Sequence, residues 1–312
     1  MSKPRFQLAD FTVYLVVRVV VCILQALPFG TACKLAGGLA WLIYKVDRRH
    51  RLVARDNLRH AFGEGDEAQR DRLVRGIYRH FCTMLIEIVH MPRLLHPQNW
   101  KQHFRLLDYK PMLGLLLSGR PVLVVSGHFG NWELGGYVFA LFGFRTAAIA
   151  RPLDNPYVDA FLRRFRENTG QKLLRKDGDF DKMQRVLANK GIMMTLGDQD
   201  AGQRGLFVDF FNRPASTHKA IALFALEYNV PMLVMTCTRR PGDPAAWSYD
   251  IWGGDVILPE EYQGRPDAVR AITQRYSTAL EGMIRRHPEQ YFWLHRRWKH
   301  QPKSKNKTKQ AA

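Results

Sequence analysis

The sequence predicts an α/β fold, in which helices flank a single mixed sheet and a membrane-anchoring helix stands at the N-terminus. Two observations indicate this fold. From Pro121 onward, short apolar runs typical of buried strands alternate with helical stretches, as in sheets that carry helices on their faces. Near the N-terminus, residues 11–27 are almost continuously apolar. With 312 residues, 46% of them apolar, the chain can form one large domain or two small ones with a substantial core.

The N-terminal apolar segment, FTVYLVVRVVVCILQAL, covers residues 11–27. Its 17 residues are at the lower limit of the roughly 17 to 25 that cross a bilayer. A secretory signal would place its charges before the apolar run and a small-residue cleavage site after it, whereas here Arg18 lies in the middle and the site is poor. We expect residues 1–30 to anchor the chain in or on a membrane, with Arg18 snorkelling or facing protein. A helix buried in the core is the alternative.

A second apolar segment, residues 31–46, precedes the basic run DRRHRLVARDNLRHAFG. Lys and Arg directly after an anchor lie where anionic lipid headgroups attract them, by about 1 kcal/mol per residue. A solvated helix face would give the same pattern. Residues 64–95 have the apolar spacing of a helix. We expect the main domain to cover residues 31–300 and the polar, basic tail 301–312 to be disordered.

The alternating region supplies the predicted sheet. Its strand-like runs are PVLVVSG (121–127), FRTAAIAR (144–151), GIMMTLGDQD (191–200) and VPMLVMTCTRR (230–240). Helical stretches near residues 134–141, 155–168, 180–189 and 217–228 separate them. Functional groups in such sheets gather beyond the carboxyl ends of the strands. The polar residues at these ends, expected to meet in one site, are His128, Glu133, Arg151, Asp198, Asp200, Arg239 and Arg240.

The charge balance narrows the class of partner. Lys plus Arg exceed Asp plus Glu by 47 − 28 = +19, which favours polyanionic partners such as nucleic acid, an anionic membrane or an acidic carrier protein. No zinc-finger spacing or RNA-recognition segment is present, so we expect no nucleic acid. The four cysteines form no C-x-x-C pair, which argues against a disulfide framework or a zinc site and fits a reducing compartment.

His128 and Glu133 lie in SGHFGNWELGG, directly after the first predicted strand. The spacing alone is uninformative, because His103 and Asp108 share it. Glycines around His128 permit a tight turn, and Asn131 can cap a helix whose first turn holds Glu133. Such a turn can bring the carboxylate onto the imidazole, where it would fix the tautomer and raise the basicity of His128 as a general base. A Glu that merely caps a helix beside a buried His is the alternative.

No nucleophile is evident beside this pair, because the segment around Ser126 lacks the G-x-S-x-G nucleophile elbow. The proton that His128 removes therefore belongs to a substrate hydroxyl, and the predicted reaction is direct transfer. An esterase or thioesterase, in which water replaces the hydroxyl, is a second interpretation. A third is a non-catalytic membrane protein that binds anionic lipids.

Four motifs, SGHFGNWELGG, IARPLDNPYVD, LGDQDAGQRGLFVDFFNRPASTHKA and HPEQYFWLHRRWK, resemble in this order those of the bacterial lipid A secondary acyltransferases of the lysophospholipid acyltransferase superfamily. The resemblance runs from the anchor to about Lys299. It implies a glycerolipid acyltransferase-like fold in an enzyme on the cytoplasmic face of the inner membrane, which moves a fatty acyl chain from acyl carrier protein, or acyl-CoA, to a glycolipid hydroxyl. His128 would deprotonate that hydroxyl, and Glu133 would orient His128 and stabilise its charge. Phosphatidylinositol mannoside and ornithine lipid remain alternative acceptors.

The other motif residues have two possible roles each. Arg151 would face the oxyanion or bind a phosphorylated headgroup, and the backbone N–H groups of Gly130 and Asn131 are rival oxyanion donors. Asp198 and Asp200 would pair with Arg side chains that hold the site, and no metal or other cofactor is expected. Phe211, with Phe207 and Phe210, would line an acyl groove or belong to the core. Arg296 and Arg297 would bind lipid phosphates or pair with the acidic segment. Where relatives commonly have FVPFFG, this chain has FVDFFN, so the acceptor stays open.

Overall fold

Seven strands form one mixed sheet at the centre of the molecule, as predicted. The computed structural model describes residues 7–167, 170–175 and 178–302. In the order β1-β9-β8-β2-β5-β3-β4, the strands are β1 (Phe104–Leu107), β9 (Tyr249–Ile257), β8 (Met232–Arg239), β2 (Val122–Ser126), β5 (Ile192–Leu196), β3 (Thr146–Ile149) and β4 (Lys172–Leu174). The five strands from β8 to β4 are parallel, whereas β9 is antiparallel to β8 and β1 is parallel to β9.

Helices cover both faces of the sheet, which is why its central strands are apolar without alternation. In β2, Leu123 and Val125 face a core shared with α9 (Phe180–Ala188), α10 (Ala220–Glu227) and α11 (Ala268–Arg286). Val122 and Val124 face a second core shared with α6 (Tyr109–Leu116) and α7 (Trp132–Leu141). The short α5 (Trp100–His103) precedes β1.

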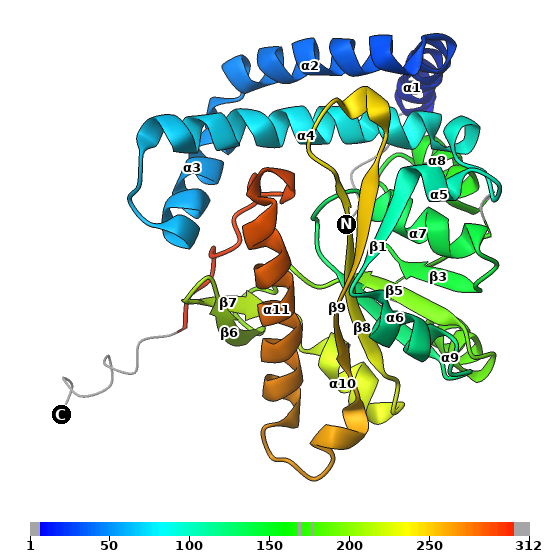
Figure 1. Ribbon diagram of the computed structural model, residues 1–312, viewed down its shortest axis with the longest axis vertical. Coiled ribbons are helices and arrows are strands. Elements are labelled where there is room, and N and C mark those ends of the chain that lie inside the picture. The colour runs from blue at the N-terminus through cyan, green and yellow to red at the C-terminus, as the bar shows by residue number, and fades with distance from the viewer. Residues whose placement is uncertain (1–6, 168–169, 176–177, 303–312) are drawn as a thin grey trace.

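Three helices pack together beyond one end of the sheet (Figure 1). They are α2 (Phe29–Val46), α3 (Arg48–Phe62) and α4 (Glu67–Leu94), of which α2 and α4 lie across that end. Ala32, Ala36 and Ala40 form a buried stripe on α2, and their small side chains let this helix lie close along α4. In turn, α4 directs buried polar side chains toward the strand ends, among them His80 and Glu87.

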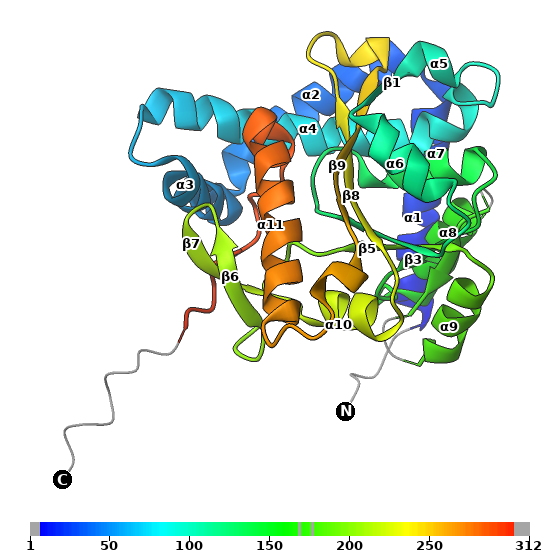
Figure 2. The same cartoon turned by 60° about the horizontal axis from the view of Figure 1, so that its bottom comes forward.

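The N-terminal helix α1 (Gln7–Ala26) lies along α8 (Pro156–Glu167), as Figure 2 shows. The Phe11 and Tyr157 rings meet edge to face with centroids 5.4 Å apart, and the Arg18 guanidinium lies 5.0 Å from the centre of the Phe161 ring. Arg18 therefore faces protein. None of the residues of α1 is buried, so it is not a core helix. It is the one helix of the described chain that is long and apolar enough to cross a membrane.

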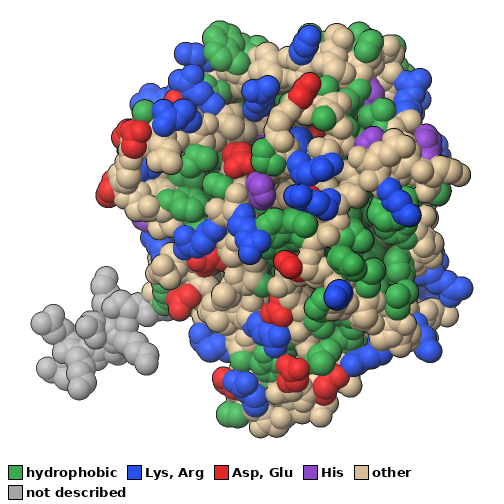
Figure 3. Space-filling model, viewed as in Figure 1, with side chains coloured by type: hydrophobic (Ala, Val, Ile, Leu, Met, Phe, Trp, Pro, Cys, Tyr) green, Lys and Arg blue, Asp and Glu red, His purple; other side chains and the backbone are tan. Residues whose placement is uncertain are grey.

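A small hairpin, β6 (Leu206–Phe210) with β7 (Arg213–Thr217), stands outside the main sheet. Its two turn residues, Phe211 and Asn212, have φ angles of 54° and 57°, as a type I′ turn requires. Asn tolerates this left-handed conformation, which accounts for the Asn of FVDFFN. The predicted disordered tail lies outside the described residues, apart from Gln301 and Pro302. Lys and Arg side chains are spread over the face seen in Figure 3 rather than gathered in one patch.

Candidate active site

A cavity of about 880 Å³ opens beyond the carboxyl ends of β2, β3 and β5. Its wall is mainly apolar and includes Met183, Met193, Ile221 and Phe224. The polar side chains His128, Glu133, Arg151, Arg166 and Gln199 also face it. The cavity therefore combines room for a hydrocarbon chain with a titratable group in its wall.

His128 is held by Asp198, not by Glu133. The Nδ1 atom of His128 lies 2.8 Å from Asp198 Oδ1, and the backbone N–H of His128 donates to Asp198 Oδ2 at 2.9 Å. The two residues meet because β2 and β5 are neighbouring parallel strands, with Ser126 in register with Leu196. Gly127 makes room for this contact, since a Cβ there would lie 3.2 Å from the Asp198 carboxyl carbon. The expected pairing of Asp198 with an Arg side chain is wrong as well.

The contact sets the protonation of both groups. Burial favours the neutral imidazole, but the charge and hydrogen bond of Asp198 outweigh it and raise the pKa of His128 above its ordinary value. Burial also opposes ionisation of Asp198, yet its interactions with His128 hold the pKa of this carboxyl well below its usual range. Asp198 is therefore an anion that holds the Nδ1–H tautomer of His128 and leaves Nε2 as the basic nitrogen.

The His128 ring is also fixed by aromatic neighbours and by its backbone. Trp132 meets the ring edge to face with centroids 5.1 Å apart, and the Phe292 ring lies 6.2 Å away. The backbone N–H of Phe292 donates to the His128 carbonyl oxygen at 2.9 Å. On the cavity side, Gln199 Nε2 approaches His128 Nε2 at 3.5 Å. The Nε2 atom of His128 thus points into the cavity.

Glu133 forms a bidentate ion pair with Arg166 instead of contacting His128. The Arg166 Nε donates to Glu133 Oε2 at 2.8 Å, and Nη2 donates to Oε1. The prediction that Glu133 orients the imidazole is therefore wrong, because the first turn of α7 directs this side chain toward α8. Its charge is close enough to contribute to the raised pKa of His128.

The backbone N–H groups of Gly130 and Asn131 are not available to an oxyanion. The Gly130 N–H donates to the carbonyl oxygen of Gln290 at 3.0 Å, and that of Asn131 donates to the carbonyl oxygen of Cys237 at 2.7 Å. The side chain of Asn131 is 1% exposed and caps α7 by accepting from the Leu134 N–H at 3.0 Å. Direct substrate contact by these two residues, as predicted, is contradicted.

Arg151 lies at the mouth of the cavity, as predicted from its place after the second strand-like run. Its side chain is 88% exposed and pairs only loosely with Asp154, at 3.9 Å. Such a guanidinium can reach a ligand at the rim. Its exposure favours a phosphorylated headgroup over a buried oxyanion.

Two further predicted residues lie away from the cavity. Asp200 pairs with His300 at 2.6 Å and not with an Arg. Phe211 is buried in the core against Phe62 and Trp293, which makes it a core residue and not part of an acyl groove.

Of the two neighbouring arginines in the last motif, one lies at the surface and the other in the core. Arg297 is 1% exposed and donates to the Ser216 carbonyl oxygen at 2.7 Å and to Thr217 Oγ1 at 2.8 Å, so it cannot bind a lipid phosphate. Its partners belong to β7 and not to the acidic segment. Arg296 is exposed and does not line the cavity.

Arg239 and Glu87 are buried behind the His128 turn and were not predicted as a pair. Arg239 follows the fourth strand-like run, but its side chain points away from the cavity and donates to Glu87 of α4. No local pattern marks Glu87, because it lies within an ordinary helical stretch. The one feature of the sequence that could have drawn attention to Glu87 is that an acidic residue stands on the apolar side of a helix.

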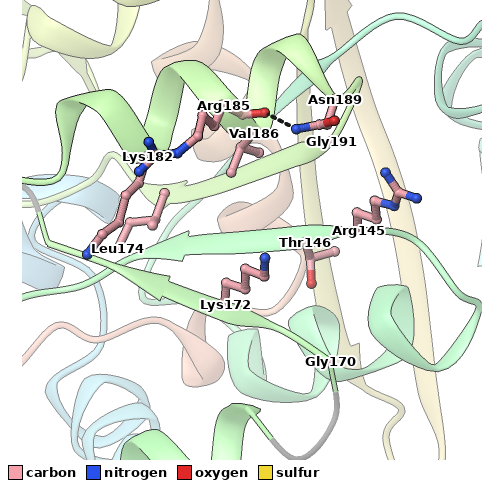
Figure 4. A pocket seen from close by; sticks show the side chains of 10 residues that line it. All are labelled: Arg145, Thr146, Gly170, Lys172, Leu174, Lys182, Arg185, Val186, Asn189 and Gly191. Atoms are coloured by element: carbon pink, nitrogen blue, oxygen red, sulfur yellow. Dashed lines mark hydrogen bonds between the residues drawn. The ribbon is translucent and has the colours of Figure 1, made fainter.

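A second hollow, of about 500 Å³, lies between α9 and the amino ends of β3 and β5 (Figure 4). Its described lining is basic and contains Arg145, Lys172, Lys182 and Arg185, with no histidine or acidic side chain. It therefore provides no general base. Among the described residues, no group of three or more His, Cys, Asp or Glu side chains could hold a metal ion.

Comparisons with known proteins agree on one family. The family model described as bacterial lipid A biosynthesis acyltransferase matches residues 2–300. The chain is 25% identical over 279 residues to a lipid A biosynthesis palmitoleoyltransferase of Escherichia coli (strain K12), covering 88% of this chain and 87% of the relative. It is 24% identical to a lipid A biosynthesis lauroyltransferase of the same strain, covering 91% and 90%.

Two further matches are to acyltransferases named for other lipids. A phosphatidylinositol mannoside acyltransferase of Mycobacterium tuberculosis (strain ATCC 25618 / H37Rv) is 23% identical over 253 residues, covering 78% of this chain and 76% of the relative. Among solved structures, the 1-acyl-sn-glycerophosphate acyltransferase PlsC from Thermotoga maritima matches with a TM-score of 0.38 at 11% identity, covering 80% of this chain and 94% of that chain.

Proposed function

This chain belongs to the bacterial lipid A biosynthesis acyltransferase family, and we propose that it moves a fatty acyl chain from the thioester of acyl carrier protein to a hydroxyl of a lipid A precursor or related glycolipid, with His128 as the general base. The observation that carries the proposal is the His128–Asp198 pair in the wall of an apolar cavity. The enzyme is an acyltransferase, like its relatives.

The chemistry follows from the two nitrogens of His128. Nδ1–H is held by Asp198, so Nε2 accepts the proton of the acceptor hydroxyl as its oxygen attacks the thioester carbonyl. Asp198 stabilises the imidazolium that results. When the tetrahedral intermediate collapses, the C–S bond breaks, the ester C–O bond is complete, and Nε2 returns the proton to the departing thiolate. No covalent enzyme intermediate is required.

The cavity supports the substrate class. Its apolar wall around Met183, Met193 and Phe224 suits the acyl chain, while Arg151 and Arg163 at the rim suit a phosphorylated headgroup. The relative named as a phosphatidylinositol mannoside acyltransferase supports a related glycolipid as the alternative acceptor. Acyl-CoA is the alternative donor.

The length, the apolar surface and the exposure of α1 support its attachment to a membrane. The outer face of α2 adds large exposed apolar side chains, namely Leu35, Leu39, Trp41, Leu42 and Val46. We infer that both helices contact the cytoplasmic face of the bacterial inner membrane. The cationic surface suits the anionic headgroups there.

The test is acyl transfer by the full chain in detergent, with purified acyl carrier protein thioester and a hydroxylated lipid A precursor. We expect His128→Ala to lower the rate by about 10² to 10⁴. Transfer at a near wild-type rate in this variant would overturn the catalytic role. Thioester hydrolysis without acceptor would support a thioesterase instead. Mass spectrometry of lipids from cells with and without the gene identifies the acceptor, and an unchanged lipid A beside another altered lipid would overturn the lipid A assignment.

A further inference from the structure

A buried ion pair, Glu87 with Arg239, lies behind the turn that carries His128. Glu87 of α4 is completely buried, and the Arg239 side chain of β8 is 11% exposed. The Arg239 Nε donates to Glu87 Oε1. Neither side chain lines the cavity. The proposed reaction therefore uses neither of them directly, although burying two charges requires strong compensating interactions.

One connection from this pair to the turn runs through Asn131. The Nδ2 of Asn131 donates to Glu87 Oε2 at 2.9 Å, while its Oδ1 accepts from the Leu134 N–H. Asn131 is thus held by α4 from one side and caps α7 on the other. Its side-chain orientation is fixed by the charge on Glu87, because only an acceptor there can receive the Nδ2–H.

A second connection runs through His80. Arg239 Nη1 lies 3.1 Å from His80 Nδ1, and His80 Nε2 lies 3.2 Å from the carbonyl oxygen of Gly130. Burial and the charge of Arg239 hold the pKa of His80 well below its ordinary value. The ring is therefore neutral, with Nδ1 accepting from Arg239 and Nε2–H donating to Gly130.

A third connection joins the backbone of the turn to the backbone of Arg239. Gln290 accepts from the Gly130 N–H through its carbonyl oxygen, accepts from the Arg239 N–H through Oε1 at 2.9 Å, and donates to the Arg239 carbonyl oxygen at 2.8 Å. Gly130 has a φ of 64°, and a Cβ on it would lie 2.1 Å from the Cys237 carbonyl oxygen. The turn is thus pressed against β8 and cannot move independently of Arg239.

We propose that Glu87 and Arg239 are positioning residues, which hold Gly130 and Asn131 so that His128 faces its substrate in the reacting geometry. This inference rests on the proposed function. Apolar side chains of similar volume often replace a buried ion pair without loss of stability. They could fill this space, but they could not accept from Asn131 or donate to His80. A displacement of about 1 Å at a reacting group can lower a rate about 10²-fold.

The main test is the double variant Glu87→Leu/Arg239→Met in the full chain. We expect kcat to fall about 10²-fold while KM for the acyl donor stays within about twofold. The rates are compared well below the melting temperature of each variant. The matched control is Arg275→Met/Asp255→Leu, which removes an ion pair between α11 and β9 that does not line the cavity, and its kcat should stay near wild type. A wild-type kcat in the Glu87/Arg239 variant would overturn the proposal.

If the double variant does not fold, a single substitution at Asn131 still tests the proposal. Asn131→Ser keeps an oxygen that can cap α7 but removes the donor to Glu87. We expect kcat to fall about tenfold in Asn131→Ser, with a modestly lowered melting temperature because Glu87 Oε2 loses its buried donor, so the rate is measured well below that temperature. In Asn131→Asp kcat should fall further, because two carboxylates then face each other. An unchanged kcat in Asn131→Ser would overturn the proposal.

A spectroscopic readout separates this inference from the proposed function. In histidine-labelled protein without substrate, the Nδ1–H proton of His128, bonded to Asp198, should give a downfield NMR signal that His128→Ala removes. We expect the Glu87/Arg239 double variant and Asn131→Ser to broaden or shift this signal, and the Arg275/Asp255 control to leave it unchanged. If wild type transfers no acyl group, the proposed function fails while this signal still tests the positioning. An unshifted signal in both test variants would overturn the proposal.

Discussion

Asp198 holds His128 through two atoms at once, the ring nitrogen and the backbone nitrogen. A carboxylate that binds only the ring would leave the backbone of the histidine unconstrained. Here the same side chain fixes both the position of the residue and the tautomer of its ring. The base that we propose is thus oriented before a substrate arrives, which would avoid reorganisation during the reaction.

The pH profile of Asp198→Asn tests this arrangement. The general base must be neutral, so activity falls as pH decreases through the pKa of His128, which the wild-type charges of Asp198 and Glu133 raise above about 6.5. Without the Asp198 charge this pKa falls. We expect the acid limb of kcat/KM to move to lower pH and the plateau to fall about 10²-fold or more. The kcat/KM profile is measured between pH 5 and 9. An acid limb of Asp198→Asn at the same pH as in wild type would contradict the role of Asp198.

At the level of single residues, the sequence could identify His128, the base that we propose, but not the residue that holds it. His128 was predictable because it follows a buried strand and lies between glycines. Asp198 is 70 positions away, and its contact depends on β5 being the neighbour of β2, which no local pattern reveals. The sequence also could not show which of the neighbours Arg296 and Arg297 is buried. In the structure, only Arg297 is.

Among the elements, the helices α7 to α10 and the strands β2, β3, β5 and β8 agree with the predicted stretches to within a few residues. They were predictable because the strands are buried on both faces and the helices between them are clearly bounded. β9 was not, since its sequence contains Gly253-Gly254 and two acidic residues. Those acids, Asp250 and Asp255, are neutralised by Arg105 and Arg275, which are distant in sequence.

The outer face of α2 can be tested separately from α1. We expect a fluorescent label at Leu39, in otherwise full-length protein, to be quenched by brominated lipids in anionic vesicles, because this side chain is 49% exposed on the apolar face. A label at Leu117, which is 74% exposed between the end of α6 and the start of β2, is the matched control and should not be quenched. Equal quenching at both positions, or at neither, would contradict contact between α2 and the bilayer.

For the whole molecule, the net charge of +19 is the property that sequence reasoning could use only in general terms. The structure shows cations spread over a broad face, with no single basic patch on the side seen in Figure 3. Such a distribution raises the local concentration of any acidic partner without defining one docking geometry. The same cationic side chains can therefore attract both an acidic acyl donor and an anionic membrane.

The contribution of this charge to donor binding can be isolated with neutral detergent micelles, which remove the anionic lipid surface. Between 50 and 300 mM NaCl, we expect KM for acyl carrier protein thioester to rise about tenfold, because salt screens the attraction between the cationic enzyme and the acidic carrier. A neutral acyl-pantetheine of the same chain length should show little change. A rise of similar size for both donors would contradict electrostatic recognition of the carrier.

The order of the central strands also has a consequence for biosynthesis. β3 leaves the ribosome before β5, yet β5 lies between β2 and β3 in the finished sheet. His128 therefore meets Asp198 only after a later segment has inserted between two earlier ones. A nascent chain that already carries α1 and His128 therefore lacks the proposed catalytic pair until β5 has taken its place in the sheet.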